Sequence, residues 1–115
     1  MSLSILLRCI DLEQTRKFYE SVLCFEVSST AENTITVAKS DARLVFTSQD
    51  LWSSQPGFSG TIYVTVTDLD EYFSIVESKA PIAWPLQVMP YGSREFAVTD
   101  CNGYLIAFHQ DARRQ

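Results

Sequence analysis

Hydrophobic and polar residues alternate in two different ways near the start of the chain. In residues 4–23, "SILLRCIDLEQTRKFYESVL", a short apolar stretch precedes Asp11, and the residues after Asp11 are apolar at helical spacing. Asp11 is a suitable N-cap, and Gln14 lies three residues later, as in a capping box. The pattern therefore predicts a strand followed by a helix. The residues expected on the buried side of this helix are Leu12, Thr15, Phe18, Tyr19, Val22 and Leu23.

The second half of the chain repeats this plan. In "TIYVTVTDLDEYFSIVESK", apolar residues alternate at Ile62, Val64 and Val66, and Asp68 with Glu71 three residues on repeats the cap. The inward helix positions are Leu69, Tyr72, Phe73 and Val76. Three strand-like stretches follow each helix, at residues 25–29, 34–39 and 42–48 and then at 82–89, 94–99 and 104–110. An internal repeat of this kind predicts an α+β fold of two tandem β-α-β-β-β modules that form a curved mixed sheet around a cleft.

The length favours one domain that holds both modules. A chain of 115 residues with 46% hydrophobic residues can bury a single core. We expect residues 1–115 to form one domain, with module one at about 3–49, a linker at about 50–59 and module two at about 60–110. The linker contains the Ser, Pro and Gly residues typical of connecting segments, along with Trp52 and Phe58.

Strand alternation divides the predicted sheet residues between two faces. One set is expected to face the helices: Leu3, Ile5, Leu7, Leu44, Phe46, Ile62, Val64, Ile106 and Phe108. The other set is expected to face away from them: Ser4, Leu6, Arg8, Arg43, Val45, Tyr63, Thr65, Leu105, Ala107 and His109. This second set is mixed in polarity. A ligand, water or a partner sheet is therefore expected to cover it.

Composition excludes several classes of function. The net charge is -5, and Lys and Arg are scattered, so no basic face is expected for nucleic acid or an anionic membrane. The acidic balance modestly favours a cationic small molecule. Cys9, Cys24 and Cys101 are odd in number and have no paired spacing, which indicates reduced thiols rather than a disulfide framework or zinc cluster. With no long apolar run and no secretory signal pattern, the expected location is the cytoplasm.

The paired modules, opened by "LRCIDLEQTRKFYESVLCFEV" and closed by "YGSREFAVTDCNGYLIAF", resemble the vicinal-oxygen-chelate superfamily of glyoxalases, bleomycin-resistance proteins and extradiol dioxygenases. The resemblance covers nearly the whole chain. The aromatic-Gly-x-Arg-Glu-Phe run and the following Asp-x-x-Gly are most similar to the bleomycin-resistance branch, which implies a homodimer that traps a drug in clefts built from both subunits. Two residues depart from the family pattern: Cys24 replaces a glycine that favours a left-handed backbone, and Cys101 replaces a proline.

Metal-dependent members of that superfamily bind one divalent ion through four strand positions. The resemblance places these positions at Ser4, Val45, Thr61 and Ala107. A hydroxyl is a weak ligand, and Val and Ala side chains have no donor atom, so no metal or other cofactor is expected. His109 and Glu95 lie near the last position, but one imidazole and one carboxylate do not make a four-position site.

Seven residues are candidates for contact with a ligand: Arg8, Arg43, Trp52, Tyr63, Trp84, Tyr91 and His109. Arg8 and Arg43 are expected on the face away from the helices, where each needs an anionic ligand or an acid such as Glu95 or one from another subunit. The aromatic residues suit a planar or cationic ligand, although Trp52 could equally anchor the linker across a dimer. Arg94 and Glu95 are neighbours on a strand and should face opposite ways.

The sequence therefore predicts a homodimeric protein that sequesters an organic small molecule, a cationic one included, in a metal-free cleft. No catalytic residue is assigned, because His109 is the only imidazole and no nucleophile motif accompanies it. Two alternatives stay open. One is a glyoxalase-like lyase or isomerase that works without the usual metal, and the other is a dimeric interaction module whose cleft is filled by its own side chains.

Overall fold

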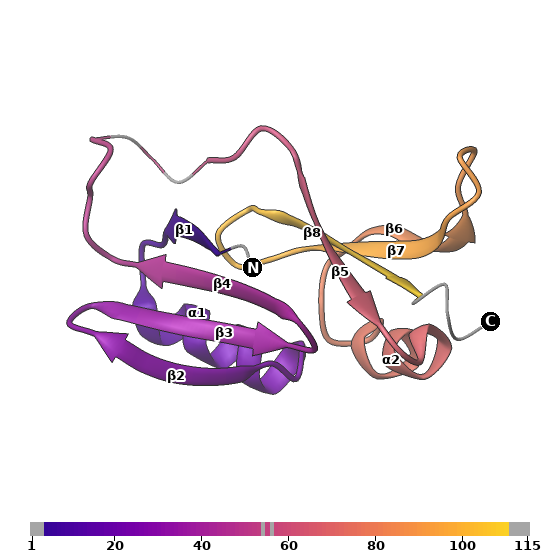
Figure 1. The fold of residues 1–115 in the computed structure, drawn as a ribbon, viewed down its shortest axis with the longest axis horizontal. Helices are drawn as coiled ribbons and strands as arrows, with labels where there is room; N and C mark the ends of the chain where they lie inside the picture. Colours follow the sequence, from indigo (N-terminus) through magenta and orange to yellow (C-terminus); the bar gives the residue numbers. More distant parts are fainter. Residues whose placement is uncertain (1–3, 54, 56, 111–115) are drawn as a thin grey trace.

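The computed structural model describes residues 4–53, 55 and 57–110. Module one begins with a strand, continues through a short helix that ends in one π-helical turn, and finishes with three strands (Figure 1). Its elements are β1 (Ile5–Arg8), α1 (Leu12–Lys17), η1 (Phe18–Val22), β2 (Glu26–Ala31), β3 (Thr34–Lys39) and β4 (Ala42–Thr47).

Module two repeats the order of elements without the π-helical turn. Its elements are β5 (Thr61–Val66), α2 (Leu69–Val76), β6 (Ile82–Val88), β7 (Arg94–Thr99) and β8 (Leu105–Gln110). Figure 1 shows the two modules side by side, with β4 and β5 as the last strand of one and the first strand of the other. Of the helices in the described residues, none is long and apolar enough to cross a membrane.

In the described residues, the strands form two separate four-stranded sheets with the same topology. The orders are β1-β4-β3-β2 and β5-β8-β7-β6. The first strand of each module runs parallel to its last strand, and the remaining neighbours are antiparallel. The predicted fold class of two β-α-β-β-β modules is confirmed.

Both helices begin at the predicted aspartates. The backbone N–H of Gln14 donates to Asp11 Oδ1 at 3.0 Å, and the N–H of Glu71 donates to Asp68 Oδ1 at 3.2 Å. Each bond satisfies one of the amides that a helix leaves unpaired at its start. These caps fix where the chain turns from the first strand of a module into its helix.

The predicted division of the sheet residues between two faces is confirmed. Equivalent pairs such as Ile5 with Leu44 and Ile62 with Ile106 lie side by side in the two sheets. Of the helix-facing set, Ile5 is partly buried and Leu3 lies outside the described residues. The others are buried, namely Leu7, Leu44, Phe46, Ile62, Val64, Ile106 and Phe108. The opposite set includes the exposed side chains of Ser4, Leu6, Arg43, Tyr63 and Thr65.

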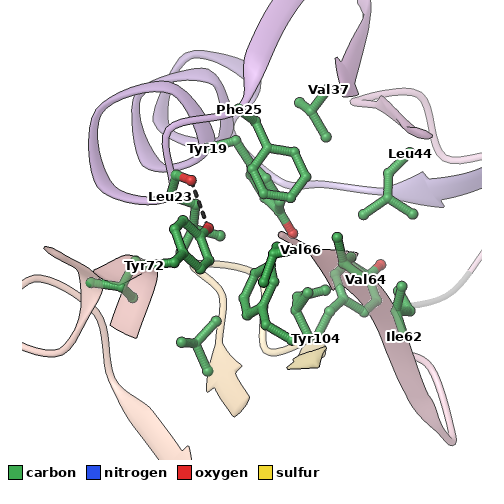
Figure 2. Packing of buried hydrophobic residues seen from close by; sticks show 14 of the residues in the cluster. Tyr19, Leu23, Phe25, Val37, Leu44, Ile62, Val64, Val66, Tyr72 and Tyr104 are labelled. Carbon is green, nitrogen blue, oxygen red and sulfur yellow. Dashed lines mark hydrogen bonds between the residues drawn. The ribbon is translucent and has the colours of Figure 1, made fainter. Parts of the chain in front are cut away.

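One hydrophobic core joins the two modules on the helix side of the sheets. In Figure 2 the rings of Tyr19 and Phe25 from module one point toward Tyr72 and Val64 of module two. The ring of Phe25 also meets that of Phe108 edge to face, with centroids 6.4 Å apart. Because residues from both modules fill this core, the modules are held together by burial of apolar surface.

Hydrogen bonds from tyrosines also cross between the modules. The Tyr72 hydroxyl donates to the carbonyl of Leu23 at 2.6 Å, the bond drawn in Figure 2. The Tyr104 hydroxyl donates to the carbonyl of Arg8, also at 2.6 Å. Each bond fixes the position of a tyrosine of module two against the backbone of module one, so the inter-module contact is specific as well as apolar.

Asp100, in the turn between β7 and β8, is the polar centre of the inter-module contact. Its Oδ2 accepts a 2.5 Å hydrogen bond from the Tyr19 hydroxyl, and its Oδ1 accepts from the backbone N–H groups of Asn102 and Tyr104. Burial raises the pKa of this carboxyl above its usual range, although the hydrogen bonds act in the opposite direction. The Asp100 side chain thus links the helical segment of module one to a turn of module two.

Candidate functional site

A cleft of about 590 Å³ lies between the two modules. Module one contributes residues from β1, the end of β3, the turn that follows it and the start of β4, and module two contributes the edge strand β5. A volume of this size suits a drug-sized organic molecule. The residues that line the cleft are Ser4, Ile5, Ala38, Ser40, Asp41, Ala42, Arg43, Leu44, Ile62, Tyr63 and Val64.

Two of the predicted ligand-contact residues therefore line one cleft. Arg43 belongs to module one and Tyr63 to module two, and both side chains are exposed. Arg43 forms no ion pair with any of the described residues. The cleft has apolar walls with a cation, a carboxylate at Asp41 and a phenol at Tyr63, which is the composition of a site that orients an organic ligand.

Tyr63 starts a row of side chains that crosses the second sheet. Its neighbour across β5 and β8 is Ala107, the next across β8 and β7 is Ala97, and the last across β7 and β6 is Trp84. Both alanines are fully buried even though they face away from the helices. The two small residues thus separate the Tyr63 and Trp84 side chains along this row and are covered by the surrounding side chains.

Glu95 lies in the adjacent row and binds two of the aromatic side chains. Its carboxylate accepts a 2.8 Å hydrogen bond from the Tyr91 hydroxyl at Oε1 and a 3.2 Å bond from Trp84 Nε1 at Oε2. The residue is fully buried. The hydroxyls of Tyr91 and Tyr63 are 3.0 Å apart. A continuous set of hydrogen bonds, the Glu95 network, therefore runs from this buried carboxylate to the ring that lines the cleft.

The turn between β6 and β7 holds Tyr91 over this network. The N–H of Met89 donates to the carbonyl of Ser93 at 2.8 Å, and the N–H of Gly92 donates to the carbonyl of Met89 at 2.8 Å. Gly92 has φ 93°, a conformation that a side chain with a Cβ strongly disfavours. The hydrogen bond to Tyr63, burial and the nearby Glu95 all raise the pKa of Tyr91, so its phenol is neutral at physiological pH.

His109 lies beside Tyr63 at the end of β8. Its Nε2 is 2.9 Å from the hydroxyl oxygen of Thr65, and its ring meets the Tyr63 ring edge to face with centroids 5.9 Å apart. In the strand register His109 is the direct neighbour of Glu95. The predicted residues Tyr63, Trp84, Tyr91 and His109 are thus on one face of module two.

Arg8 and Trp52 lie in a different place. They line a smaller hollow of about 200 Å³ beneath the linker, together with Leu6, Phe58 and Tyr104. The Arg8 guanidinium forms an ion pair with Asp50, Nε to Oδ1 at 3.8 Å. The acid beside Arg8 is therefore a linker residue, whereas the sequence suggested Glu95 or another subunit.

Arg94 and Glu95 face opposite sides of β7, as strand alternation predicts. Arg94 forms a bidentate contact with Asp70 at the start of α2, with distances of 3.0 and 2.5 Å. This contact lowers the pKa of the Asp70 carboxyl. Arg94 thus holds the helix against the sheet, and Glu95 belongs to the face that carries the candidate site.

The four strand positions that the resemblance assigns to metal ligands carry side chains that suit a metal poorly. Ala107 is fully buried and Val45 is half-buried, and neither side chain has a donor atom. Ser4 and Thr61 offer only hydroxyls, which are weak ligands for nickel, zinc or iron. Among residues 4–53, 55 and 57–110, no group of three or more His, Cys, Asp or Glu side chains is arranged to hold a metal ion.

Glu95 is the component of the site that the sequence left without a role. The alternation rule indicated that it faces away from Arg94, but not which side chains surround it. Its contacts depend on irregular pairing between β6 and β7, where the register shifts on both sides of Trp84. The proximity of two tyrosines and a tryptophan to one carboxylate is therefore a property of the folded hairpin.

Comparison with known proteins places the chain in a family. Residues 3–108 match the model of the glyoxalase/bleomycin resistance protein/dioxygenase superfamily. The chain belongs to this superfamily. No curated protein matches the sequence.

Solved structures confirm the fold at low sequence identity. A superfamily member from Sphaerobacter thermophilus is 22% identical, with a TM-score of 0.79 over 96% of this chain and 97% of that one. TioX from Micromonospora sp. ML1 is 21% identical, with a TM-score of 0.78 over 96% and 98%. An integron cassette protein from the mobile metagenome of Vibrio cholerae is 18% identical, with a TM-score of 0.74 over 97% and 95%.

Proposed function

We propose that this protein binds and sequesters an organic small molecule, without a metal, in the cleft between its two modules. The observation that carries the proposal is the cleft of about 590 Å³, whose apolar walls come from both modules and whose polar groups include Arg43 and Tyr63. Apolar walls bury the ligand, and a few convergent polar groups fix its orientation. The donor-poor side chains at Val45 and Ala107 favour binding without a metal.

The proposed active form is a homodimer. Within the described residues, β1 and β5 each have one edge without a strand neighbour, and such edges are available for pairing with another chain. Apolar side chains are also exposed along β1 and the linker, including Leu6, Leu51, Trp52 and Phe58. A second copy that covers them would bury this surface and deepen the cleft. Light scattering coupled to size exclusion should give twice the chain mass, and a monomer at all concentrations would contradict this part of the proposal.

A thermal-shift and tryptophan-fluorescence screen tests the proposed function. Drugs and small metabolites, with cationic compounds among them, are added to the purified protein with and without divalent metal ions. We expect a ligand-specific rise in the unfolding temperature that does not require metal, and the ligand should be recovered unchanged after incubation. A shift that appears only with metal, or one equivalent of bound nickel, zinc, iron or manganese by elemental analysis, would contradict the proposal.

Two aromatic substitutions locate the ligand once the screen supplies one. Tyr91→Ala should weaken binding by about 1–3 kcal/mol, because it removes the side chain that holds the Tyr63 hydroxyl at the cleft and opens the Glu95 network. Trp52→Ala is the matched control, since this exposed ring lies in the separate hollow beneath the linker. An unchanged dissociation constant for Tyr91→Ala together with a loss for Trp52→Ala would move the site to that hollow.

A further inference from the structure

The Glu95 network has a fixed direction of hydrogen-bond donation. The indole N–H of Trp84 can only donate, and an ionised carboxylate can only accept. Trp84 therefore donates to Oε2 of Glu95, and Tyr91 donates its single hydroxyl proton to Oε1. Both oxygens of this fully buried carboxylate are thus supplied with donors from neutral side chains.

The same reasoning extends to the ring that lines the cleft. Because the proton of Tyr91 is directed to Glu95, the 3.0 Å contact between the two tyrosine hydroxyls requires Tyr63 to donate to Tyr91. The proton of Tyr63 is then used as well. What remains at the Tyr63 hydroxyl is acceptor capacity, and this half-exposed side chain lines the cleft.

We infer that the Tyr63 oxygen is a hydrogen-bond acceptor that selects ligands carrying a cationic N–H group, such as a protonated amine. This inference rests on the proposed function, because it names the class of molecule that the cleft binds. In the Glu95 network, the buried carboxylate fixes the donor direction of Tyr91 and so makes Tyr63 an acceptor toward the cleft. An ammonium group at this position donates a charge-assisted hydrogen bond to the Tyr63 oxygen, which is stronger than a bond from a neutral donor.

A cationic donor suits this position better than a neutral one. None of the ion pairs in the described residues involves Glu95, so a nearby ligand cation would supply an opposite charge to a buried carboxylate. His109 is the strand neighbour of Glu95, but its Nε2 is directed to Thr65. On the module-one wall Arg43 and Asp41 both line the cleft, so that wall carries charges of both signs.

The substitution Glu95→Gln should reverse the direction of hydrogen-bond donation in the Glu95 network. Trp84 N–H still requires an acceptor, so the amide oxygen of Gln takes the place of Oε2 and the amide nitrogen takes the place of Oε1. That nitrogen donates to Tyr91, and Tyr91 then donates to Tyr63. The Tyr63 hydroxyl keeps its proton, which now points into the cleft as a donor. The variant should therefore prefer a ligand that carries an acceptor.

The experiment uses two probes with the same phenyl ring. Phenethylammonium carries a cationic N–H group, and 3-phenylpropionate carries an anionic acceptor. Fluorescence titration should show that the wild-type protein binds phenethylammonium about tenfold more tightly than 3-phenylpropionate, the ratio expected for one charge-assisted hydrogen bond. Glu95→Gln should invert this order. Glu77→Gln is the matched control, because it makes the same change at an exposed residue that ends α2 and does not line the cleft, and it should leave the order unchanged.

A second variant keeps the test decisive if Glu95→Gln does not fold, as judged by circular dichroism. Tyr63→Phe removes the terminal oxygen and should abolish the preference for phenethylammonium without inverting it. Equal binding of both probes by the wild-type protein, or an order that Glu95→Gln and Glu77→Gln change alike, would overturn the inference while leaving the proposed function standing. If neither probe nor any screened compound binds, the proposed function fails too.

Discussion

The two modules share one strand order and one pattern of buried helix-side residues but carry different side chains on the opposite face. On the helix side, Phe46 of β4 and Phe108 of β8 occupy equivalent places and are both fully buried. On the other side, Leu6 pairs with Val45 in module one, whereas Tyr63 pairs with Ala107 in module two. Packing against a helix thus preserved one face of the duplicated sheet, while the other face was free to acquire polar and aromatic groups.

The difference extends across the sheets. Beyond Val45 the row in module one continues with Thr36, and beyond Ala107 the row in module two continues with Ala97 and then Trp84. The alanines leave room in which Trp84 and Tyr91 approach Glu95. Module one has no such carboxylate on its equivalent strand in the described residues, since β3 reads Thr34 to Lys39 without an acidic side chain. The chemistry of the site therefore depends on module two, and module one supplies a wall.

The largest expected effect tests whether the helix side is equivalent in both modules. Phe108→Ala and Phe46→Ala should each reduce the free energy of unfolding by about 3–5 kcal/mol, because each leaves a cavity in the shared core. Urea denaturation followed by circular dichroism measures the change. Tyr63→Ala is the control on the opposite face and should cost about 1 kcal/mol or less. An equal loss for Tyr63→Ala would mean that this face is packed like a core.

The next prediction concerns Asp100, the polar link between the modules. Because burial raises its pKa above 3.8, the stability that this group contributes is complete below that pH and is lost as the pH rises through its folded-state pKa. The Asn side chain in Asp100→Asn has nearly the size of Asp but cannot carry its charge. We expect the wild-type protein to lose stability relative to Asp100→Asn from about pH 4 upward, with a slope no steeper than about 1.4 kcal/mol per pH unit.

Urea denaturation of both proteins between about pH 4 and about pH 7 measures this difference. Asp70→Asn is an informative control, because the contact with Arg94 lowers the pKa of Asp70, and the sign of its pH dependence is therefore the opposite. A wild-type protein that gains stability over Asp100→Asn as the pH rises would show that the hydrogen bonds from Tyr19 and the turn outweigh burial.

The features that the sequence predicts well are those that repeat within it. Alternation in the first and last strands of each module assigns Leu7, Phe46, Val64 and Phe108 to the core, because a strand with one buried face admits only one register. The caps at Asp11 and Asp68 follow from local hydrogen bonding. These features depend on residues close in sequence or on a period of two, so one chain is enough to identify them.

The site is only partly predictable for the opposite reason. Alternation places Tyr63 and Arg43 on the right faces, but the cleft that both line depends on how the modules pack. Likewise, Arg8 was grouped with Arg43, yet Arg8 lies beneath the linker with Asp50. Linker conformation and the irregular β6–β7 pairing join residues that no local pattern connects. The position of Glu95 is the clearest case.

A smaller effect on stability is expected from the different backbone conformations at the ends of η1 and α2. Cys24 follows η1 with φ 62°, the left-handed conformation that its replacement of a glycine predicts, whereas α2 ends at Glu77 in a right-handed conformation. Cys24→Gly should raise the free energy of unfolding by about 0.5–1 kcal/mol, because the relief of strain exceeds the entropy that glycine adds to the unfolded chain. Cys24→Ala, which keeps the Cβ, should give no such gain. Equal gains in both variants would attribute the effect to loss of the thiol.

The smallest expected effect belongs to the contact between Arg94 and Asp70, which supports α2 and has no equivalent in the ion pairs of module one. Both side chains are largely exposed, so solvent and salt screen their attraction. Asp70→Asn should shift the urea midpoint less than Phe108→Ala, Phe46→Ala or Cys24→Gly, and the shift should vanish at about 1 M salt, where the Debye length is about 3 Å. A large shift that survives salt would indicate that the bidentate geometry itself orders α2.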